Sequence, residues 1–271
     1  METQTIYGHA AVQALLAKQV EGSAFAHAYL FSGPQGIGKY LVAKQFAGRI
    51  LNNALSDYFE LDLAEQNTIE QLREFLSIIS VRPVKGQWKV AVLNNFDLAS
   101  GTLGNAILKT LEEPSPSTII IVISSKQLLP TITSRCQVIS FHRLSAAELG
   151  QFAKASKLAA PKEIIEMAAG SPSRLVELVN NNSLTQNISA WADRLTEVQG
   201  KPVSDKLLLV SELGSEESET LREVLLAFLE RQRSKLAEHP QSVVAMRKTM
   251  EALSLLRFNL NKKLVLQRLL L

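Results

Sequence analysis

The most constraining feature of the sequence is a glycine-rich turn between an apolar run and a stretch with helical spacing. Residues 29–31 are apolar, and residues 41–50 carry apolar side chains at the intervals of an amphipathic helix, so the order is strand, loop, helix. Between them, Gly33-x4-Gly38-Lys39 has the spacing of a phosphate-binding loop. In such a loop the glycines let backbone N–H groups face a polyphosphate, and the lysine reaches the outer phosphates. The candidate phosphate-binding residues are Gly33, Gly36, Gly38 and Lys39.

Three further positions argue against catalysis at this loop. A phosphate-binding loop that holds magnesium continues with Ser or Thr, whereas this chain has Tyr40, a phenol too long and rigid for that geometry. At the end of a later apolar run, Asn94 and Asn95 stand where an ATPase has Asp and Glu, which hold magnesium and orient water. The sequence predicts a phosphate cradle without its metal ligands. Two alternatives stay open: a glycine-rich turn with no ligand, and a merely polar strand end at residues 94 and 95.

The pattern of strands and helices predicts an α/β domain followed by helices only. Strand patterns occur in residues 29–31, 58–63, 88–93, 118–123 and 138–141. Helical patterns alternate with them, among them residues 68–80 with Asn67 or Thr68 as the N-cap, which argues for a parallel sheet covered on both faces. We predict a phosphate-binding α/β domain in residues 1–143, a helical lid in 144–182 and a helical bundle in 183–271. The polar stretch 180–183 marks the second boundary, and the expected bundle helices are residues 184–198, 203–213, 218–238 and 241–271.

Composition restricts the cellular context more than the chemistry. The 271 residues carry a formal charge of +3, which is too small to argue for nucleic-acid binding by itself. Cys136 is the only cysteine, so an intrachain disulfide or a cysteine-based zinc site is excluded. The sequence shows no leader pattern and no apolar run of bilayer length. These observations predict a cytoplasmic protein.

Several motifs together resemble the clamp-loader branch of the AAA+ ATPases over nearly the whole chain. The segments that carry the resemblance are residues 27–34, 81–83, 105–114, 129–136, 170–174 and 261–266. The Ser-Arg-Cys triplet 134–136 and the Leu-Glu-Glu-Pro run 111–114 are its most specific parts. The resemblance implies that residues 183–271 form a collar that joins equivalent domains of other subunits.

The resemblance also implies residue roles. Arg135, flanked by Ser134 and Cys136 of the same motif, corresponds to an arginine finger offered to a neighbouring subunit's nucleotide; the alternative is an ion pair with a local carboxylate. Arg174 corresponds to a second sensor, completing a degenerate pocket with the loop glycines, Lys39, Tyr40 and Asn94. We interpret Cys136 as a buried small apolar residue rather than as a nucleophile, because no His is near it in the sequence.

The departures from the family pattern decide the implied function. Family members commonly carry a four-cysteine zinc module after the first loop helix, and residues 51–66 contain no cysteine, so no zinc is expected. No other metal site is predicted. The altered residues 40, 94 and 95 favour an ATPase-inactive, stator-like subunit of the bacterial replicative clamp loader. No cofactor is required for that role, and residual ATP or ADP binding is compatible with it.

The resemblance implies that the chain binds the gamma/tau motor and delta subunits through the collar. It implies contact with the sliding clamp and primer-template DNA through the whole complex, and no membrane partner. Lys109, Lys262 and Lys263 could approach DNA, although solvated surface charge is the simpler interpretation. Two alternatives belong to other classes. One is an active ATPase motor that recruits a carboxylate such as Asp97, and the other is a DNA-binding AAA+ regulator.

Overall fold

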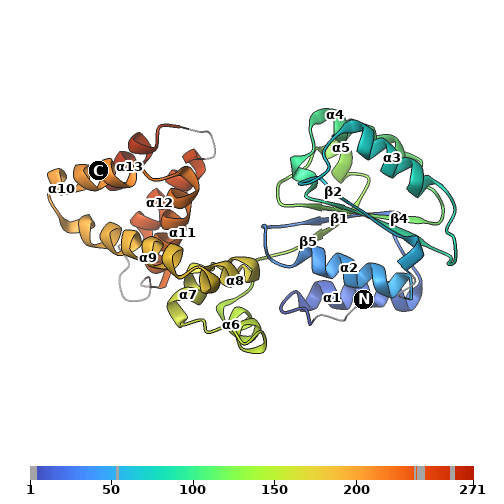
Figure 1. The fold of residues 1–271 in the computed structure, drawn as a ribbon, viewed down its shortest axis with the longest axis horizontal. Coiled ribbons are helices and arrows are strands. Elements are labelled where there is room, and N and C mark those ends of the chain that lie inside the picture. Colours follow the sequence, from blue (N-terminus) through green and yellow to red (C-terminus); the bar gives the residue numbers. More distant parts are fainter. Residues whose placement is uncertain (1–4, 53–54, 235, 237–241, 257–259) are drawn as a thin grey trace. The chain divides into compact units, whose positions relative to one another are not determined.

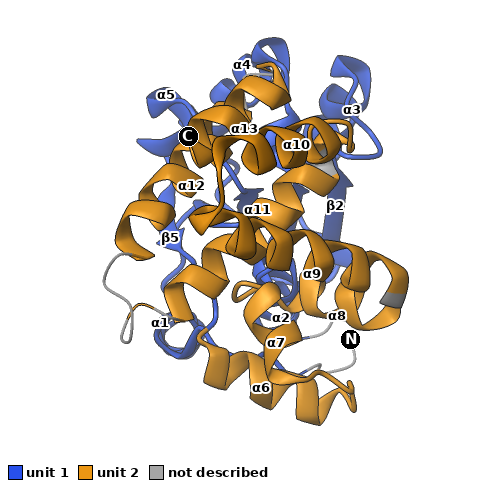
Figure 2. Cartoon of the chain, turned by 90° about the vertical axis from the view of Figure 1, so that its left-hand side faces the viewer, with its two compact units in different colours: residues 1–144 blue, residues 145–271 orange. Residues whose placement is uncertain are grey.

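The chain forms two compact units, Met1–Leu144 and Ser145–Leu271, shown in Figures 1 and 2. The computed structural model describes residues 5–52, 55–234, 236, 242–256 and 260–271. The division lies one residue from the predicted end of the α/β domain. In the described ranges, every helix falls short of the length and apolarity that crossing a membrane would require.

The first unit contains a five-stranded parallel sheet in the order β2-β3-β4-β1-β5. Its strands are β1 (Ala28–Ser32), β2 (Tyr58–Asp62), β3 (Lys89–Asn94), β4 (Thr118–Ser124) and β5 (Gln137–Ser140). Every residue of β4 is buried, as expected for an inner strand covered on both faces. The predicted α/β class with a parallel sheet is therefore confirmed, and all carboxyl ends lie at one edge of the sheet.

Helices cover both faces of this sheet (Figure 1). They are α1 (Ala10–Gly22), α2 (Lys39–Ile50), α3 (Ile69–Ser80), α4 (Gly101–Glu112) and the short α5 (Pro130–Thr133), which the sequence pattern did not predict. Because alternate strand residues face opposite sides, Leu30 of β1 packs in one core cluster with Leu72 of α3 and Ile107 of α4. Tyr29 faces the other side, with its ring 5.3 Å from that of Phe46 in α2.

Helix α3 begins where one of the two predicted caps stands. The Oγ1 of Thr68 accepts from the N–H of Gln71, and the Oε1 of Gln71 accepts from the N–H of Thr68, both over 3.2 Å. This reciprocal capping box fixes the first turn. The helix ends at Ser80, shortly before Pro83, which has no N–H to continue it.

A buried carboxylate holds the loop that joins α3 to β3. Asp57, whose side chain is inaccessible, accepts from the N–H of Val84 over 2.6 Å and from the N–H of Lys85 over 3.0 Å. Burial acts to raise the pKa of this carboxyl, but the N–H groups of Val84, Lys85 and Gly86 and the cation of Lys89 outweigh it and lower the pKa. The carboxylate therefore stabilises the folded unit.

We expect Asp57→Ala to lower the free energy of unfolding of the first unit by about 2 kcal/mol at pH 7, because the hydrogen bonds of a buried, charged carboxylate to the loop N–H groups are lost. Since the folded pKa lies below the unfolded value of about 3.9, the contribution is present above that pH and disappears as pH falls through the folded pKa. Urea unfolding followed by Trp88 fluorescence in a Trp191→Phe background measures it. The exposed Glu65→Ala is the control, and an equal stability of Asp57→Ala and the unmutated chain at pH 7 would contradict the assignment.

The second unit is helical throughout its described residues. Its helices are α6 (Ala146–Ala155), α7 (Lys162–Met167), α8 (Pro172–Asn180), α9 (Asn182–Glu197), α10 (Val203–Leu213), α11 (Ser218–Ser234), α12 (Ser242–Leu256) and α13 (Lys262–Leu270). Helix α11 packs against α7, α9 and α12. The predicted stretch 241–271 contains two helices, and the amide oxygen of Asn261 caps the second by accepting from the N–H of Lys263 over 3.0 Å. The end of the predicted helix 218–238 falls largely outside the described residues.

The predicted boundary at residues 182 and 183 is a helix junction. Asn181 ends α8 and caps α9, accepting from the N–H of Leu184 over 3.1 Å. The helices predicted as a lid contact those predicted as a bundle, α7 with α11 and α8 with α9. The separation of a lid from a collar stays a prediction within one compact unit.

Candidate functional site

The glycine-rich loop follows β1 and opens α2 at the carboxyl edge of the sheet. Gly33, Gly36 and Gly38 have φ values of 155°, 74° and 97°, which side chains rarely adopt. A Cβ at Gly33 would lie 2.3 Å from the carbonyl oxygen of Phe141. The N–H of Phe141 donates to the carbonyl of Ser32 over 2.7 Å, so the loop packs on the end of β5. Glycine at position 33 is required by this close approach.

Lys39 is directed at the loop itself. Its Nζ donates to the carbonyls of Gly33 and Pro34, each over 2.6 Å, and to Oγ of Ser125 over 3.3 Å. The residue is only 5% exposed. Burial lowers the pKa of Lys39 to about 8, and the charge of Asp97 acts in the opposite direction. A polyphosphate would have to draw this ammonium away from two carbonyl acceptors.

The structure adds Ser125 and Asp97 to the predicted site. The N–H of Ser125, directly after β4, donates to Oδ1 of Asp97 over 2.8 Å. Asp97 follows β3, Ser125 follows β4, and Lys39 follows the loop after β1. Their hydrogen bonds therefore connect the carboxyl ends of these three strands. Ser125 was not predicted as a site residue, although a polar residue directly after a buried strand was a usable signal, because ligands bind at the carboxyl ends of parallel strands.

A segment before α1 also reaches the loop. The Nε2 of His9 lies 2.8 Å from the carbonyl oxygen of Ile37, and its ring packs edge-on against Phe141 with centroids 5.0 Å apart. His9 has a left-handed backbone conformation with φ 56°. No periodic sequence pattern predicted this contact, because it depends on how the chain enters α1.

Tyr40 is turned toward the edge strand β2. Its hydroxyl donates to Oε2 of Glu60 over 3.0 Å, and the hydroxyl of Tyr58 donates to the same oxygen over 2.8 Å. Lys44 Nζ lies 3.5 Å from the Tyr40 hydroxyl. Burial, followed by the hydrogen bond and charge of Glu60, raises the pKa of Tyr40 to about 12. The hydroxyl therefore stays protonated as a donor to β2.

Asn94 and Asn95 are bound to a second carboxylate of β2. The Nδ2 of Asn94 donates to Oδ2 of Asp62 over 2.8 Å, and the Nδ2 of Asn95 donates to Oδ1 over 2.7 Å. The N–H of Ala64 also donates to Oδ1, over 2.9 Å. Burial acts to raise the pKa of Asp62, but these three donors lower it. The amides present their N–H groups to the carboxylate.

The residues at these positions do not fit a magnesium ion. Magnesium needs oxygen ligands that converge on one point. Here the Tyr40 hydroxyl is committed to Glu60, and Asn94 and Asn95 offer only neutral amide oxygens, which carry no charge to offset a divalent cation. In the part of the chain that the structure describes, His, Cys, Asp and Glu side chains form no group of three or more that could hold a metal ion. The expected absence of a metal stays a prediction.

Arg135 lies beside the acidic end of α4. Its Nη2 is 2.6 Å from Oε1 of Glu112, and its Nη1 donates to the carbonyl of Thr131 over 2.7 Å and to Oγ of Ser134 over 3.5 Å. The local carboxylate pair that the sequence left open is thus present. The side chains of Arg135 and Glu112 are 34% and 49% exposed, and an exposed pair of this kind contributes only about 0–1 kcal/mol. The side chain of Arg135 is therefore partly exposed, with both terminal nitrogens hydrogen-bonded within the first unit.

Cys136 packs against the core of the first unit. Burial raises the pKa of its thiol to about 11, so the thiol stays protonated near neutral pH. The side chain is half-buried, and its interpretation as a buried small apolar residue rather than a nucleophile stays a prediction.

Arg174 is engaged within the helical unit. Its Nε donates to the carbonyl of Met167 over 2.9 Å, and its Nη1 forms an ion pair with Glu223 of α11. The side chain is 12% exposed. These contacts connect α8 to α11, and the role of Arg174 as a second sensor stays a prediction.

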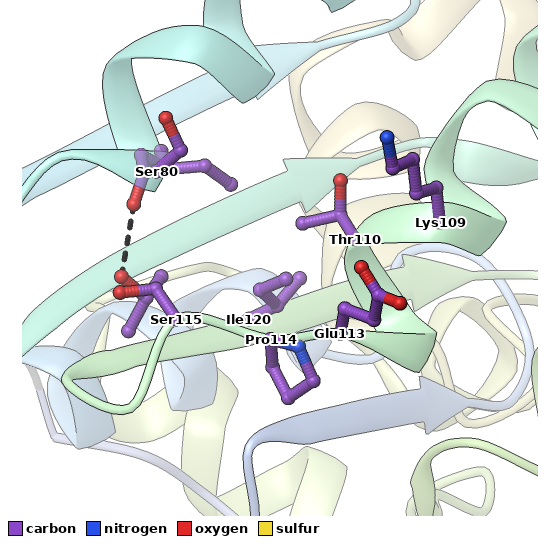
Figure 3. Close-up of a pocket in the computed structure, with 9 residues that line it drawn as sticks. Ser80, Lys109, Thr110, Glu113, Pro114, Ser115 and Ile120 are labelled. Carbon is purple, nitrogen blue, oxygen red and sulfur yellow. Dashed lines mark hydrogen bonds between the residues drawn. The ribbon is translucent and has the colours of Figure 1, made fainter.

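The candidate DNA-contacting lysines have different surroundings. Lys262 donates to the carbonyl of Glu216, whereas Lys263 is exposed. Figure 3 shows Lys109 with Thr110 and Glu113 around a cavity of about 270 Å³ at the amino end of β4. On its wall the hydroxyl of Thr118 donates to the carbonyl of Ile79 over 2.9 Å. This cavity lies at the end of the sheet opposite the glycine-rich loop.

A larger cavity adjoins the candidate site. It has a volume of about 490 Å³ and is lined by Asp97, by Gly101 and Gly104 of α4, and by Lys126 and Pro130 among others. It shares only Asp97 with the residues around Lys39.

Sequence comparisons relate the chain to subunits of DNA polymerase III. Residues 49–145 match the family described as "DNA polymerase III, delta subunit". The chain is 33% identical to DNA polymerase III subunit tau of Bacillus subtilis over 144 residues, which cover 45% of this chain and 26% of that protein. It is 32% identical to subunit delta′ of Pseudomonas aeruginosa over 190 residues, 59% of this chain and 58% of that protein. The chain thus spans less than two thirds of the length of these relatives.

Solved structures show the fold. The chain superposes on RuvB of Thermotoga maritima with a TM-score of 0.51 and 15% identity, covering 84% of this chain and 78% of that chain. A structure of katanin superposes with a TM-score of 0.50 and 14% identity, covering 70% and 73%. These likenesses agree with the observed fold, an α/β domain with a parallel sheet followed by a helical C-terminal region.

Proposed function

We propose that this chain, a relative of the DNA polymerase III clamp-loader subunits, is a delta-prime-type subunit: an ATPase-inactive, stator-like component that helps to load the sliding clamp onto DNA. One observation carries the proposal. The three positions that would hold magnesium or orient the attacking water carry neutral side chains that are hydrogen-bonded to β2, Tyr40 to Glu60 and both Asn94 and Asn95 to Asp62. Without that anchor a nucleotide has no positioned metal to neutralise the charge of phosphoryl transfer. No cofactor is needed for this role, and residual ATP or ADP binding through Lys39 is compatible with it.

The direct test is ATP turnover by the purified chain. We expect no magnesium-dependent hydrolysis above background and no difference between the unmutated chain and Lys39→Ala. A separate equilibrium titration with ATP or ADP measures residual binding. Magnesium-dependent turnover that Lys39→Ala abolishes would refute the proposal.

The same assay tests the second candidate, an active motor of the gamma/tau type. The chain is 33% identical to subunit tau and 32% identical to subunit delta′. Sequence identity therefore favours the motor and the delta-prime-type subunit about equally. It would require Asp97 to leave the N–H of Ser125 and take a metal. A DNA-binding regulator would instead show DNA affinity in the isolated chain with a steep salt dependence.

The proposed partners are the gamma/tau and delta subunits, bound through the helices of residues 183–271, with the clamp and primer-template DNA reached through the complex. Helices α10 and α13 pack against each other, as Figure 2 shows, and both carry exposed apolar side chains. Leu208 and Leu264 are 64% and 63% exposed. We assign the subunit contact to these two helices, because exposed apolar patches are typical of interaction surfaces.

We further propose that Arg135 acts in trans as an arginine finger. It lies near the surface between the end of α5 and the start of β5. A planar guanidinium is suited to charge that develops on a transferring phosphoryl group.

A further inference from the structure

The three altered positions share hydrogen-bond partners on one strand. Tyr40 donates to Glu60, and Asn94 and Asn95 donate to Asp62, over 2.7 to 3.0 Å. Glu60 and Asp62 are two residues apart on β2, so their side chains leave the same face of the strand. Leu61 between them packs into the core cluster on the opposite face. One face of β2 therefore receives all three substituted side chains.

These contacts connect α2 to the edge strand β2 and to the end of β3, and the backbone pairing of the sheet does not include α2. Within the described residues, strand β2 is at the edge of the sheet and pairs with β3 alone. The ladder places Asp62 beside Asn94, while Tyr40 belongs to the first turn of α2, directly after the glycine-rich loop. The network thus joins the start of α2, the edge strand and the end of β3.

We propose that Tyr40, Asn94 and Asn95 are positioning residues which, through Glu60 and Asp62, hold the glycine-rich loop and the end of β3 in one conformation without a magnesium nucleotide. This inference rests on the proposed ATPase-inactive role. In a nucleotide-binding subunit, a bound ligand stabilises the conformation that it binds. Here hydrogen bonds to two carboxylates supply that order, and hydrogen bonds to ionised acceptors are about twice as strong as neutral ones. A subunit that does not cycle through nucleotide states gains a fixed surface for its neighbours.

Asp62 carries more of the network than Glu60. Asp62 is half-buried and accepts from three donors, whereas Glu60 is exposed. Removing Asp62 leaves two amide groups without their acceptor, and removing the charge of Glu60 weakens two hydroxyl contacts. Substitution of Asp62 should therefore have a larger effect on the network than substitution of Glu60.

The test is amide hydrogen exchange in the full chain without nucleotide. In Asp62→Ala we expect exchange in residues 94–97, where two asparagine side chains lose their acceptor, to become about tenfold faster or more, with residues 137–139 of the opposite edge unchanged. Glu60→Gln, a mild surface substitution, should give a smaller increase confined to residues 33–40. The exposed acid Glu70 provides the matched control, and Glu70→Gln should change neither segment.

Coupling between the partners separates positioning from general stability. Tyr40→Phe should add nothing to Glu60→Ala, because each of these changes removes the hydrogen bond between Tyr40 and Glu60. An unchanged exchange pattern in Asp62→Ala, or an acceleration spread equally over the whole first unit, would overturn the proposal. ATP turnover by the unmutated chain would refute the proposed function alone, because the exchange measurement contains no nucleotide.

Discussion

Arg135→Ala in this chain alone should reduce the DNA- and clamp-stimulated ATPase of the adjacent motor site in a reconstituted clamp loader by about a thousandfold, the typical contribution of an arginine finger. The expectation depends on where Arg135 lies. Its side chain is about one-third exposed, and its Nη1 donates to the carbonyl of Thr131. A neighbouring nucleotide would gain Nη2 by displacing the exposed Glu112. Folding and assembly should be unaffected.

Two further variants distinguish a trans role from a structural one. Arg135→Lys should restore little activity, because a point charge lacks the planar fork. Glu112→Ala removes the other half of the same ion pair. If the pair is merely structural, Glu112→Ala and Arg135→Ala should behave alike. If Arg135 acts on a neighbour, Glu112→Ala should keep most of the activity, and full activity in Arg135→Ala would show the assignment to be wrong.

The architecture of the first unit could be predicted from local patterns. The β-branched run in residues 118–123 became a fully buried inner strand, because such side chains suit a parallel sheet covered on both sides. Thr68 became the N-cap of α3, since its hydroxyl and Gln71 complete a capping box. The short helix α5 was missed because four residues carry no periodicity.

The glycine-rich loop could be predicted as well, because its spacing is local. The partners of its altered residues could not. Asp62 meets Asn94 only because the register of β2 on β3 places them side by side, 32 positions apart in sequence. Arg174 meets Glu223 only because α8 packs near α11. Such contacts are set by tertiary packing, which a single sequence does not encode in any local pattern.

The second large effect is expected at the helical surface. Leu208→Asp together with Leu264→Asp should weaken incorporation of this chain into a clamp loader by about a hundredfold or more, since two central apolar contacts at an interface contribute on the order of 3 kcal/mol. Neither side chain belongs to the buried core, so the fold should tolerate both changes. Analytical ultracentrifugation or surface binding with purified motor and delta subunits measures the affinity.

The matched control for that surface is Met250→Asp on α12, where the side chain is 52% exposed but lies on neither α10 nor α13. It should bind with unchanged affinity, which separates the loss of a contact from the mere addition of a negative charge. Circular dichroism should show the same helix content in all three chains. If the double variant joined the complex as tightly as the control, the faces of α10 and α13 would not be the subunit contact, and residues 183–271 would not act as a collar through them.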